Sequence, residues 1–535
     1  MTQVEVISKT YPTHLLATKP WHPWDGGYRD KLMATESVFY HSAQAVSLDD
    51  LSTELLVLIF EQLRDIDSRA LASIRQLSRR FEAIAAPIQF DTICLNERII
   101  APQTSVYFPQ ILRYIYLFAR HVEVRSDLDP INTRRVLDRV QRLSSLRWRY
   151  VGAQPHSGFF STPSDILSSH QIKINQVRLH VADLPLKDFD RGSLDTYLRA
   201  MPSSNLVSLK MTSPTPPLTT QPEPLKQLLI EAQGIRTLYY SDRGQGTRFS
   251  FKENERLPAF EELSLRSYDW NHNVHEVRKH WDFSRLQHLT LLDVPMFQFL
   301  SSVPFETLHQ LRTLHVEDFS AHLPNRRQET TRSLYALTQQ IKALHTLKIT
   351  CHMDAFPVCG LLRHADSLRV LRFRDYVGFG DERQRCPTML VESLTRLSRN
   401  LIHLRSIELD MDAALCEPVL FLRALCNFAR LETLVLHTQT VLDPFDIVRN
   451  GVDPDYETAM GVFSALITAK QGKPWRSITI NVGGWKPAMV RRFSEAWRAQ
   501  NRRGFYAERC FVLERKGDAG EITIREETGL SNFYG

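Results

Sequence analysis

The sequence predicts an α/β protein, in which a small helical module is followed by a solenoid with parallel strands on its concave side and helices on its convex side. Three observations predict this fold. A segment of about 40 residues has the spacing of amphipathic helices, a short apolar motif returns many times after it, and helical spacing separates many of the copies. Repeats of this kind bury their apolar side chains by stacking, which gives one curved array rather than several globules.

The composition is that of a large folded chain. The 535 residues are 43% hydrophobic and 24% charged, which excludes a predominantly disordered protein. The net charge of +6 comes from 66 basic and 60 acidic residues without a strong basic cluster, so we expect no nucleic-acid partner. No stretch approaches 18 apolar residues, so we expect no membrane-spanning helix. The seven cysteines are irregularly spaced, which predicts reduced thiols in the cytoplasm or the nucleus.

The first element in the chain is an expected N-terminal arm at residues 1–46. Its aromatic residues Trp21, Trp24 and Tyr28 follow neither a helical nor a strand period. We expect a loosely ordered arm whose aromatic side chains pack against the body of the protein.

The helical module is expected at residues 47–90. Ser47 to Asp50 has the Ser-x-x-Asp form of a helix start, and Pro87 is expected to end the last helix. Two apolar stripes lie between these points, and they consist of Leu51, Leu55, Leu56, Ile59, Phe60 and Leu63, then Leu71, Ile74, Leu77 and Phe81. A module this small cannot bury so many apolar side chains alone. We therefore expect some of them to be exposed in the free protein and buried by a partner.

The repeat region is expected at residues 91–485. Its motif has apolar residues at relative positions 1, 4 and 6, and the clearest copies are residues 286–291, 311–316, 344–349, 368–373, 404–409 and 431–436. Weaker copies begin at Phe90, Ala119, Leu143, Ile174, Leu206, Ile235, Phe260 and Trp475. Successive copies between Leu206 and Leu431 begin 24 to 36 residues apart, which is the period of a solenoid with insertions. Alternation at positions 4 and 6 predicts a short strand with one buried face.

The strand residues between the buried positions are expected on the concave surface. The candidates there for binding a protein are Tyr239, Arg266, His315, Glu317, Lys348, Arg372, Arg374, Glu408 and Asp410. They carry both signs of charge, and such a surface selects a peptide or protein by electrostatic complementarity.

The chain is expected to end in a cap at residues 486–535. Residues 486–500 have helical spacing, and two alternating segments flank a turn at residues 516–520. A hairpin there covers the last repeat, because solenoid ends need caps and exposed strand edges need covering.

Catalytic, metal and cofactor motifs are not recognisable in the sequence. His275, Glu276 and His280 come close to the HExxH motif, but the second histidine stands one residue too late for one helix face to present both to a metal. Cys351, His352, Cys359 and His364 are too loosely spaced to predict a zinc site. Phosphate-loop, dinucleotide and G-x-S-x-G patterns do not occur. We expect no catalytic residue, no metal and no cofactor.

The two patterns together give the chain a family likeness. Leu51 to Leu63 reads LSTELLVLIFEQL, Leu71 to Phe81 reads LASIRQLSRRF, and Ala85 to Phe90 reads AAPIQF. With these segments and the following repeats, the chain resembles F-box proteins that carry leucine-rich repeats, of the divergent type common in filamentous fungi. Two features depart from the family pattern: Ser52 stands where a proline is usual, and the repeats lack the consensus Asn or Cys after the strand.

The resemblance implies a non-catalytic substrate receptor. The F-box helices would dock on the Skp-family adaptor of an SCF-type cullin–RING ubiquitin ligase through the ten residues of the two apolar stripes. The repeats would hold a target protein of unknown identity. Other subunits of such a ligase carry out the chemistry. The alternative is a leucine-rich-repeat scaffold that binds proteins without the adaptor and carries a degenerate F-box, and Ser52 is the feature that favours it.

Overall fold

A computed structural model describes most of the chain. The described residues are 48–151, 161–173, 176–185, 196–212, 222–242, 247–317, 324–375, 387–438, 454–482, 509–515 and 520–527. The expected arm at residues 1–46 and the expected helix at residues 486–500 lie outside them. The chain forms two compact units that divide after His180, which we call the N-terminal and the C-terminal unit. Within the described residues, no helix combines the length and apolar character that crossing a bilayer requires.

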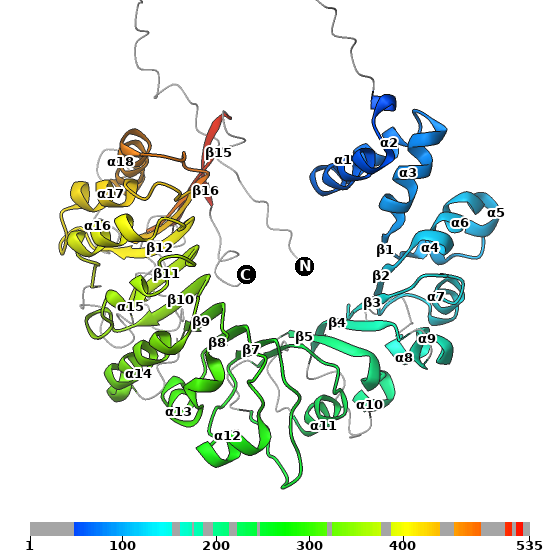
Figure 1. The fold of residues 1–535 in the computed structure, drawn as a ribbon, viewed down its shortest axis with the longest axis horizontal. Coiled ribbons are helices and arrows are strands. Elements are labelled where there is room, and N and C mark those ends of the chain that lie inside the picture. Colours follow the sequence, from blue (N-terminus) through cyan, green and yellow to red (C-terminus); the bar gives the residue numbers. More distant parts are fainter. Residues whose placement is uncertain are drawn as a thin grey trace, which may run out of the picture. The chain divides into compact units, whose positions relative to one another are not determined.

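The N-terminal unit begins with three helices and continues with strands that alternate with short helices (Figure 1). Its helices are α1 (Thr53–Ile66), α2 (Ser68–Ile74), α3 (Arg79–Phe90), α4 (Glu97–Ile100), α5 (Thr104–Tyr107), α6 (Pro109–Phe118), α7 (Pro130–Leu137), α8 (Pro163–Ile166) and α9 (Ser169–Lys173). Its strands are β1 (Thr92–Cys94), β2 (His121–Arg125) and β3 (Ser145–Arg149), which pair in parallel in the order of the sequence. The strand β4 (Arg178–Pro185) spans the boundary between the units.

Helix α1 begins five residues later than the sequence pattern predicts. Residues Leu48–Asp50 form a short 3₁₀ turn, and the side chain of Ser52 accepts a hydrogen bond of 3.4 Å from the Leu55 amide. Ser52 is therefore the N-cap, because its hydroxyl satisfies one of the amides that a helix start leaves without a partner. The expected start at Ser47 is wrong, and the residue that departs from the F-box pattern serves as the cap.

Helix α3 continues through Pro87 to Phe90, so the prediction that Pro87 ends the helix is also wrong. A proline inside a helix costs roughly 3 kcal/mol. Ile88 and Phe90 are both buried beyond it, and burying a large apolar side chain contributes roughly 1.5–3 kcal/mol. The burial of these two side chains is enough to offset the cost of the proline.

The C-terminal unit repeats one arrangement along its length. Its strands line the inner side of a curve and its helices lie on the outer side (Figure 1). The strands are β5 (Leu206–Thr212), β6 (Thr237–Ser241), β7 (Glu262–Arg266), β8 (His288–Leu292), β9 (Thr313–Glu317), β10 (Thr346–Cys351), β11 (Val370–Asp375), β12 (Ser406–Met411), β13 (Thr433–Thr438), β14 (Ser477–Val482), β15 (Arg509–Arg515) and β16 (Ile522–Glu527). The helices are α10 (Thr196–Ala200), α11 (Glu223–Glu231), α12 (Val274–His280), α13 (Met296–Ser302), α14 (Arg327–Gln340), α15 (Cys359–Leu362), α16 (Val391–Asn400), α17 (Pro418–Cys426) and α18 (Pro454–Ala469).

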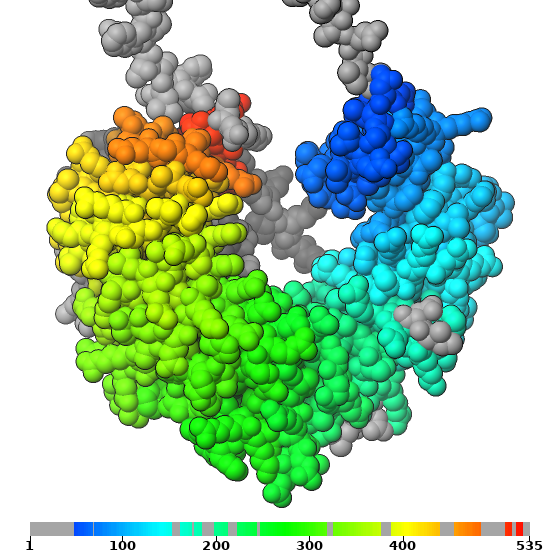
Figure 2. Space-filling view, in the orientation of Figure 1, coloured from blue at the N-terminus to red at the C-terminus, as the bar shows by residue number. Residues whose placement is uncertain are grey.

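The register of the sheet follows the apolar motif. In all six clear copies the strand begins at the third motif position, and the strands from β5 to β14 pair in parallel in sequence order. Leu314, Leu347, Leu371, Ile407 and Leu434, which stand at the fourth position, are paired neighbours and fully buried. In Figure 2 the successive repeats pack directly on one another, as a solenoid requires. The α/β prediction with parallel strands is confirmed.

The last two strands reverse the direction of the sheet. β15 pairs with β14 in antiparallel fashion, and β16 pairs with β15 in the same way. The hairpin of β15 and β16 therefore covers the edge of β14, so that this edge cannot pair with a strand of another chain.

Candidate protein-binding site

The helical module of the N-terminal unit holds its own small core. Leu56, Phe60, Leu71 and Phe81 are buried together with Ala85 and Ile88. The rings of Phe60 and Phe81 meet edge to face, with centroids 5.7 Å apart. Leu51, Leu63 and Ile74 are half-buried against this core. These seven side chains, all predicted to bind a partner, hold the three helices together.

The other three predicted residues are exposed. Leu55, Ile59 and Leu77 keep 49%, 40% and 70% of their surface accessible. Two further residues of α1 that the sequence pattern missed, Leu58 and Ile66, are 58% and 82% exposed. The exposed surface of the module therefore contains more apolar residues than the four-residue spacing in the sequence predicts.

The exposed residues of α1 share one helix face. At about 100° per residue, Ile59 and Ile66 lie within about 40° of Leu55, and Leu58 flanks them on the other side. We call Leu55, Leu58, Ile59 and Ile66 the α1 apolar stripe. Extending the helical period to the end of α1 would have found all four residues. Exposed apolar side chains gathered on one helix face in this way mark an interaction site.

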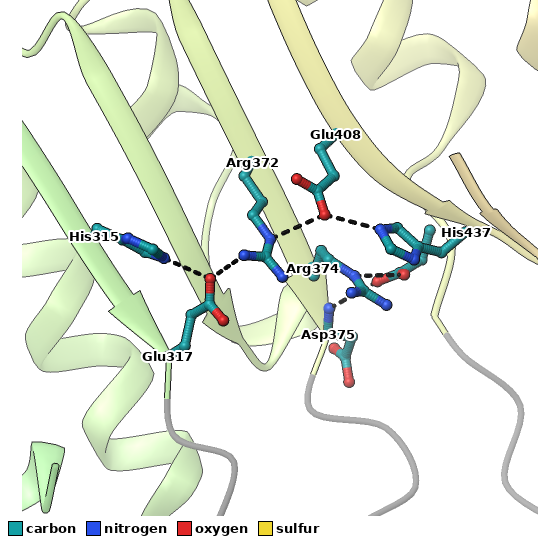
Figure 3. A network of polar contacts seen from close by, with 8 residues as sticks. His315, Glu317, Arg372, Arg374, Asp375, Glu408 and His437 are labelled. Carbon is teal, nitrogen blue, oxygen red and sulfur yellow. Dashed lines mark hydrogen bonds and ion pairs between the residues drawn. The ribbon is translucent and has the colours of Figure 1, made fainter. Parts of the chain in front are cut away.

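The concave side of the C-terminal unit carries the second set of predicted residues. Six of the nine lie close together on β9, β11 and β12, and polar contacts connect them (Figure 3). They are His315, Glu317, Arg372, Arg374, Glu408 and Asp410. With His437 on β13 and Asp375 on β11, we call them the charged network.

The longest series of contacts in the charged network crosses five strands, from β9 to β13. His315 Nε2 lies 2.5 Å from Glu317 Oε1, and the same carboxylate accepts a hydrogen bond from Arg372. Arg372 Nε lies 3.0 Å from Glu408 Oε1, and His437 Nε2 lies 2.8 Å from that oxygen. Arg372 thus reaches over β10 to Glu317 on one side and touches the next strand on the other. Alternating charges at hydrogen-bond distance bind neighbouring repeats to each other.

A second pair lies beside this series and is buried more deeply. Arg374 Nε donates to Asp410 Oδ1 at 2.9 Å, and the Asp375 amide donates to Asp410 Oδ2 at 3.1 Å. Both Arg374 and Asp410 are buried. Asp410 therefore satisfies a buried guanidinium and a buried amide at once.

The ionisation of the network agrees with this pairing. Burial raises the pKa of Glu408, but the charge of Arg372 and the hydrogen bond from His437 lower it more, so the net pKa lies far below the ordinary value. Burial likewise raises the pKa of Glu317, and the hydrogen bond from His315 with the charge of Arg372 brings the net value below normal. Burial and the charge of Arg374 lower the pKa of His437. Glu317 and Glu408 therefore stay charged, and His437 stays neutral, near pH 7.

The remaining three predicted residues stand apart from the network. The Tyr239 hydroxyl donates to Glu262, and the Lys210 ammonium nitrogen lies 4.1 Å from the centre of the Tyr239 ring. Burial and that carboxylate raise the pKa of Tyr239 well above its usual value. Arg266 on β7 and Lys348 on β10 are half-buried. His437 and Asp375 were missed, although His437 stands at the seventh motif position, as Glu317, Arg374 and Asp410 do.

Three of the residues weighed as metal ligands, Glu276, His280 and His364, have other contacts. Glu276 caps helix α12 together with Asn273, and His280 Nδ1 lies 2.6 Å from the Glu255 carbonyl oxygen. His364 Nδ1 accepts from the Leu344 amide at 3.3 Å. Across the described part of the chain, no three His, Cys, Asp or Glu side chains are grouped to hold a metal ion.

Comparison with known sequences adds no assignment. No protein-family model matches this chain. No curated protein matches it. The function is therefore inferred from the residues and their geometry.

Proposed function

We propose that this chain is a non-catalytic substrate receptor, an F-box protein, of an SCF-type cullin–RING ubiquitin ligase. In this proposal the module at residues 48–90 docks on a Skp-family adaptor, and the repeats of the C-terminal unit hold a target protein. The likeness of residues 48–90 to the F-box pattern supports the first part. The solenoid-like stack of repeats supports the second, since such arrays present extended binding surfaces.

One observation carries the proposal: the α1 apolar stripe is exposed although the module has a complete core of its own. Its four large side chains are 40% to 82% exposed. Covering a half-exposed Leu or Ile contributes on the order of 1 kcal/mol per side chain. Four such side chains on one helix face form the apolar centre of a helix-docking interface.

The test is co-purification of the full chain with a Skp-family adaptor after Leu55→Asp and Ile59→Asp substitution. Both side chains point away from the core, so the variant keeps its fold and loses the adaptor, because two carboxylates cannot be buried unpaired in the interface. Ile131→Asp is the matched control, since Ile131 is an exposed apolar residue on α7 of the same unit. Adaptor binding that survives the double substitution contradicts the proposal.

The alternative is an adaptor-independent scaffold, and Ser52 in place of the usual proline is the observation that favours it. Affinity capture from cells, with and without proteasome inhibition, separates the two functions. A receptor enriches the adaptor in both conditions and enriches its target when the proteasome is blocked. A scaffold enriches its partner equally in both conditions, and the Leu55→Asp/Ile59→Asp variant leaves the abundance of that partner unchanged.

A further inference from the structure

Basic residues stand immediately before four consecutive strands of the C-terminal unit. They are Arg312 before β9, His345 before β10, Arg369 before β11 and Arg405 before β12. We call these four residues the basic rim. They occupy the second position of the apolar motif, which places them at the amino-terminal edge of the sheet.

Backbone hydrogen bonds fix the spacing of the basic rim. The His345 amide donates to the Arg312 carbonyl at 2.8 Å, Arg369 to His345 at 2.9 Å and Arg405 to Arg369 at 2.8 Å. Adjacent strands lie about 4.8 Å apart, so the four residues form a row about 15 Å long. Gln287 and Glu432 occupy the same position in the flanking repeats and end the row.

The basic rim differs from the charged network in its pairing. Arg312, Arg369 and Arg405 are exposed, and His345 is half-buried. Among the described residues none of the four makes an ion pair, whereas Glu432 at the end of the row is paired with Lys473 at 2.6 Å. Burial and the positive charges of Arg369 and Arg312 lower the pKa of His345, which agrees with a positive potential around His345 in the row.

We infer that the basic rim binds an extended, acidic protein segment that lies across the ends of strands β9 to β12. An extended chain rises about 3.3 Å per residue, so about five residues span the row. Arginine side chains are flexible enough to reach carboxylates on either side of such a segment and can bind them with two hydrogen bonds. The inference deepens the proposed function, on which it rests only in taking this segment to belong to the target.

An acidic protein segment fits the row better than a nucleic acid does. Proteins that bind single strands stack bases on aromatic side chains, but the residues that begin the strands next to the rim are Thr313, Thr346, Val370 and Ser406. The row is also short and ends at Glu432, whereas a nucleic-acid site extends its positive charge along the strand.

The experiment measures binding of a fluorescein-labelled octaglutamate peptide to the purified full chain by fluorescence anisotropy. Replacing Arg312, Arg369 and Arg405 with Gln is expected to weaken binding about tenfold, since an exposed ion pair contributes about 0.2–1 kcal/mol. Arg396, Arg399 and Arg423 are exposed arginines on α16 and α17, so their replacement with Gln makes the same change in net charge away from the rim. This control is expected to change binding less than twofold.

Two outcomes overturn the inference. Equal losses in the rim variant and the control variant mean that only the net charge matters. Tighter binding of a labelled ten-nucleotide oligo-dT, with the same dependence on the rim, assigns the row to nucleic acid. The rim variant is also co-purified with the Skp-family adaptor. If the rim variant still binds the adaptor, loss of peptide binding at the rim leaves the proposed function intact. The peptide measurement itself requires no adaptor.

Discussion

The basic rim and the charged network belong to the same repeats, yet the two sets of charges are used differently. The network side chains of β9 to β13 contact one another and are largely buried, as Glu317, Arg374 and Asp410 show. The rim side chains stand just before these strands and make no ion pair among the described residues. Charged residues of the same repeats therefore fall into two groups. What separates the groups is whether the side chains form ion pairs within the chain, not the type of residue.

The difference has a physical origin in the cost of moving a charge out of water. A buried ion pair contributes little net stability, because desolvation opposes the attraction, but losing one partner leaves an uncompensated buried charge. The network is therefore costly to break and holds the register of neighbouring repeats. An exposed charge carries no such cost and remains available to a partner in solution. The charged network therefore stabilises the packing of neighbouring repeats, and the basic rim is available as a contact surface.

The largest predicted effect on stability comes from removing a buried carboxylate of the charged network. Asp410→Ala removes a buried carboxylate that accepts from both the Arg374 guanidinium and the Asp375 amide, so the free energy of unfolding is expected to fall by roughly 3–5 kcal/mol. Urea unfolding followed by circular dichroism measures the change. Arg405→Ala on the rim is the control, expected to stay within about 0.5 kcal/mol of the wild type. Similar losses of unfolding free energy in the two variants would contradict the distinction between the charged network and the basic rim.

Acid provides a second and smaller test, because it acts on two histidines in the same pair of repeats. His364 is buried: Nδ1 accepts from the Leu344 amide and Nε2 donates to the Thr338 carbonyl, so the neutral ring is the satisfied form. Burial lowers the pKa of His364 to about 4. The unfolded chain binds this proton more readily, so the stability that His364 contributes is complete above about pH 6.5 and is lost as the pH falls towards 4.

The expected loss from His364 is on the order of 3 kcal/mol, since each unit of pKa corresponds to about 1.4 kcal/mol. The free energy of unfolding is measured at a series of pH values from about 7 to about 4.5. His364→Gln is expected to make the free energy of unfolding clearly less dependent on pH. His345→Gln on the rim is expected to reduce this dependence less, because His345 is only half-buried. An unchanged pH dependence in His364→Gln would show that the buried ring does not control acid sensitivity.

The sequence predicts the strands well because the motif encodes them locally. Apolar residues at positions 4 and 6 need only two neighbouring repeats to be buried, so each clear copy became a strand with the same start. The charged network could not be predicted in this way. Arg372 and Glu317 are 55 residues apart and come from strands separated by β10, so their contact depends on side-chain length and curvature. His437 shares its motif position with three predicted residues, and tracing the register to β13 would have found it.

The errors in the helical module have a related cause. Ser47 and Ser52 both offer helix-start chemistry, and the choice of Ser52 depends on where Leu56 and Phe60 must lie to reach Phe81. Pro87 breaks a helix by local propensity, but the burial of Ile88 and Phe90 overrides that propensity. The sequence also did not separate the seven core side chains from the exposed ones of the same stripes, because periodicity marks an apolar face without revealing which neighbour covers it. Packing decides each of these three points.

The smallest predicted effect is a gain in stability from removing a rim charge. Arg369 lies opposite Arg405, which stands at the start of the adjacent strand, and like charges directly opposite each other on neighbouring strands are destabilising. Arg369→Gln is expected to raise the free energy of unfolding by about 0.2–0.5 kcal/mol at low ionic strength, and the gain disappears in about 1 M NaCl as screening removes the repulsion.

The matched comparison is Arg372→Gln, three residues along the same segment but inside the charged network. That variant is expected to lose stability at every salt concentration, because Glu317 and Glu408 keep their buried charges without a cation between them. Opposite signs for two Arg→Gln changes in one repeat would separate a charge that repels its neighbours from a charge that connects them. A loss of stability in Arg369→Gln would mean instead that the rim arginine is already engaged within the chain, and the row could not then bind an acidic segment without first releasing it.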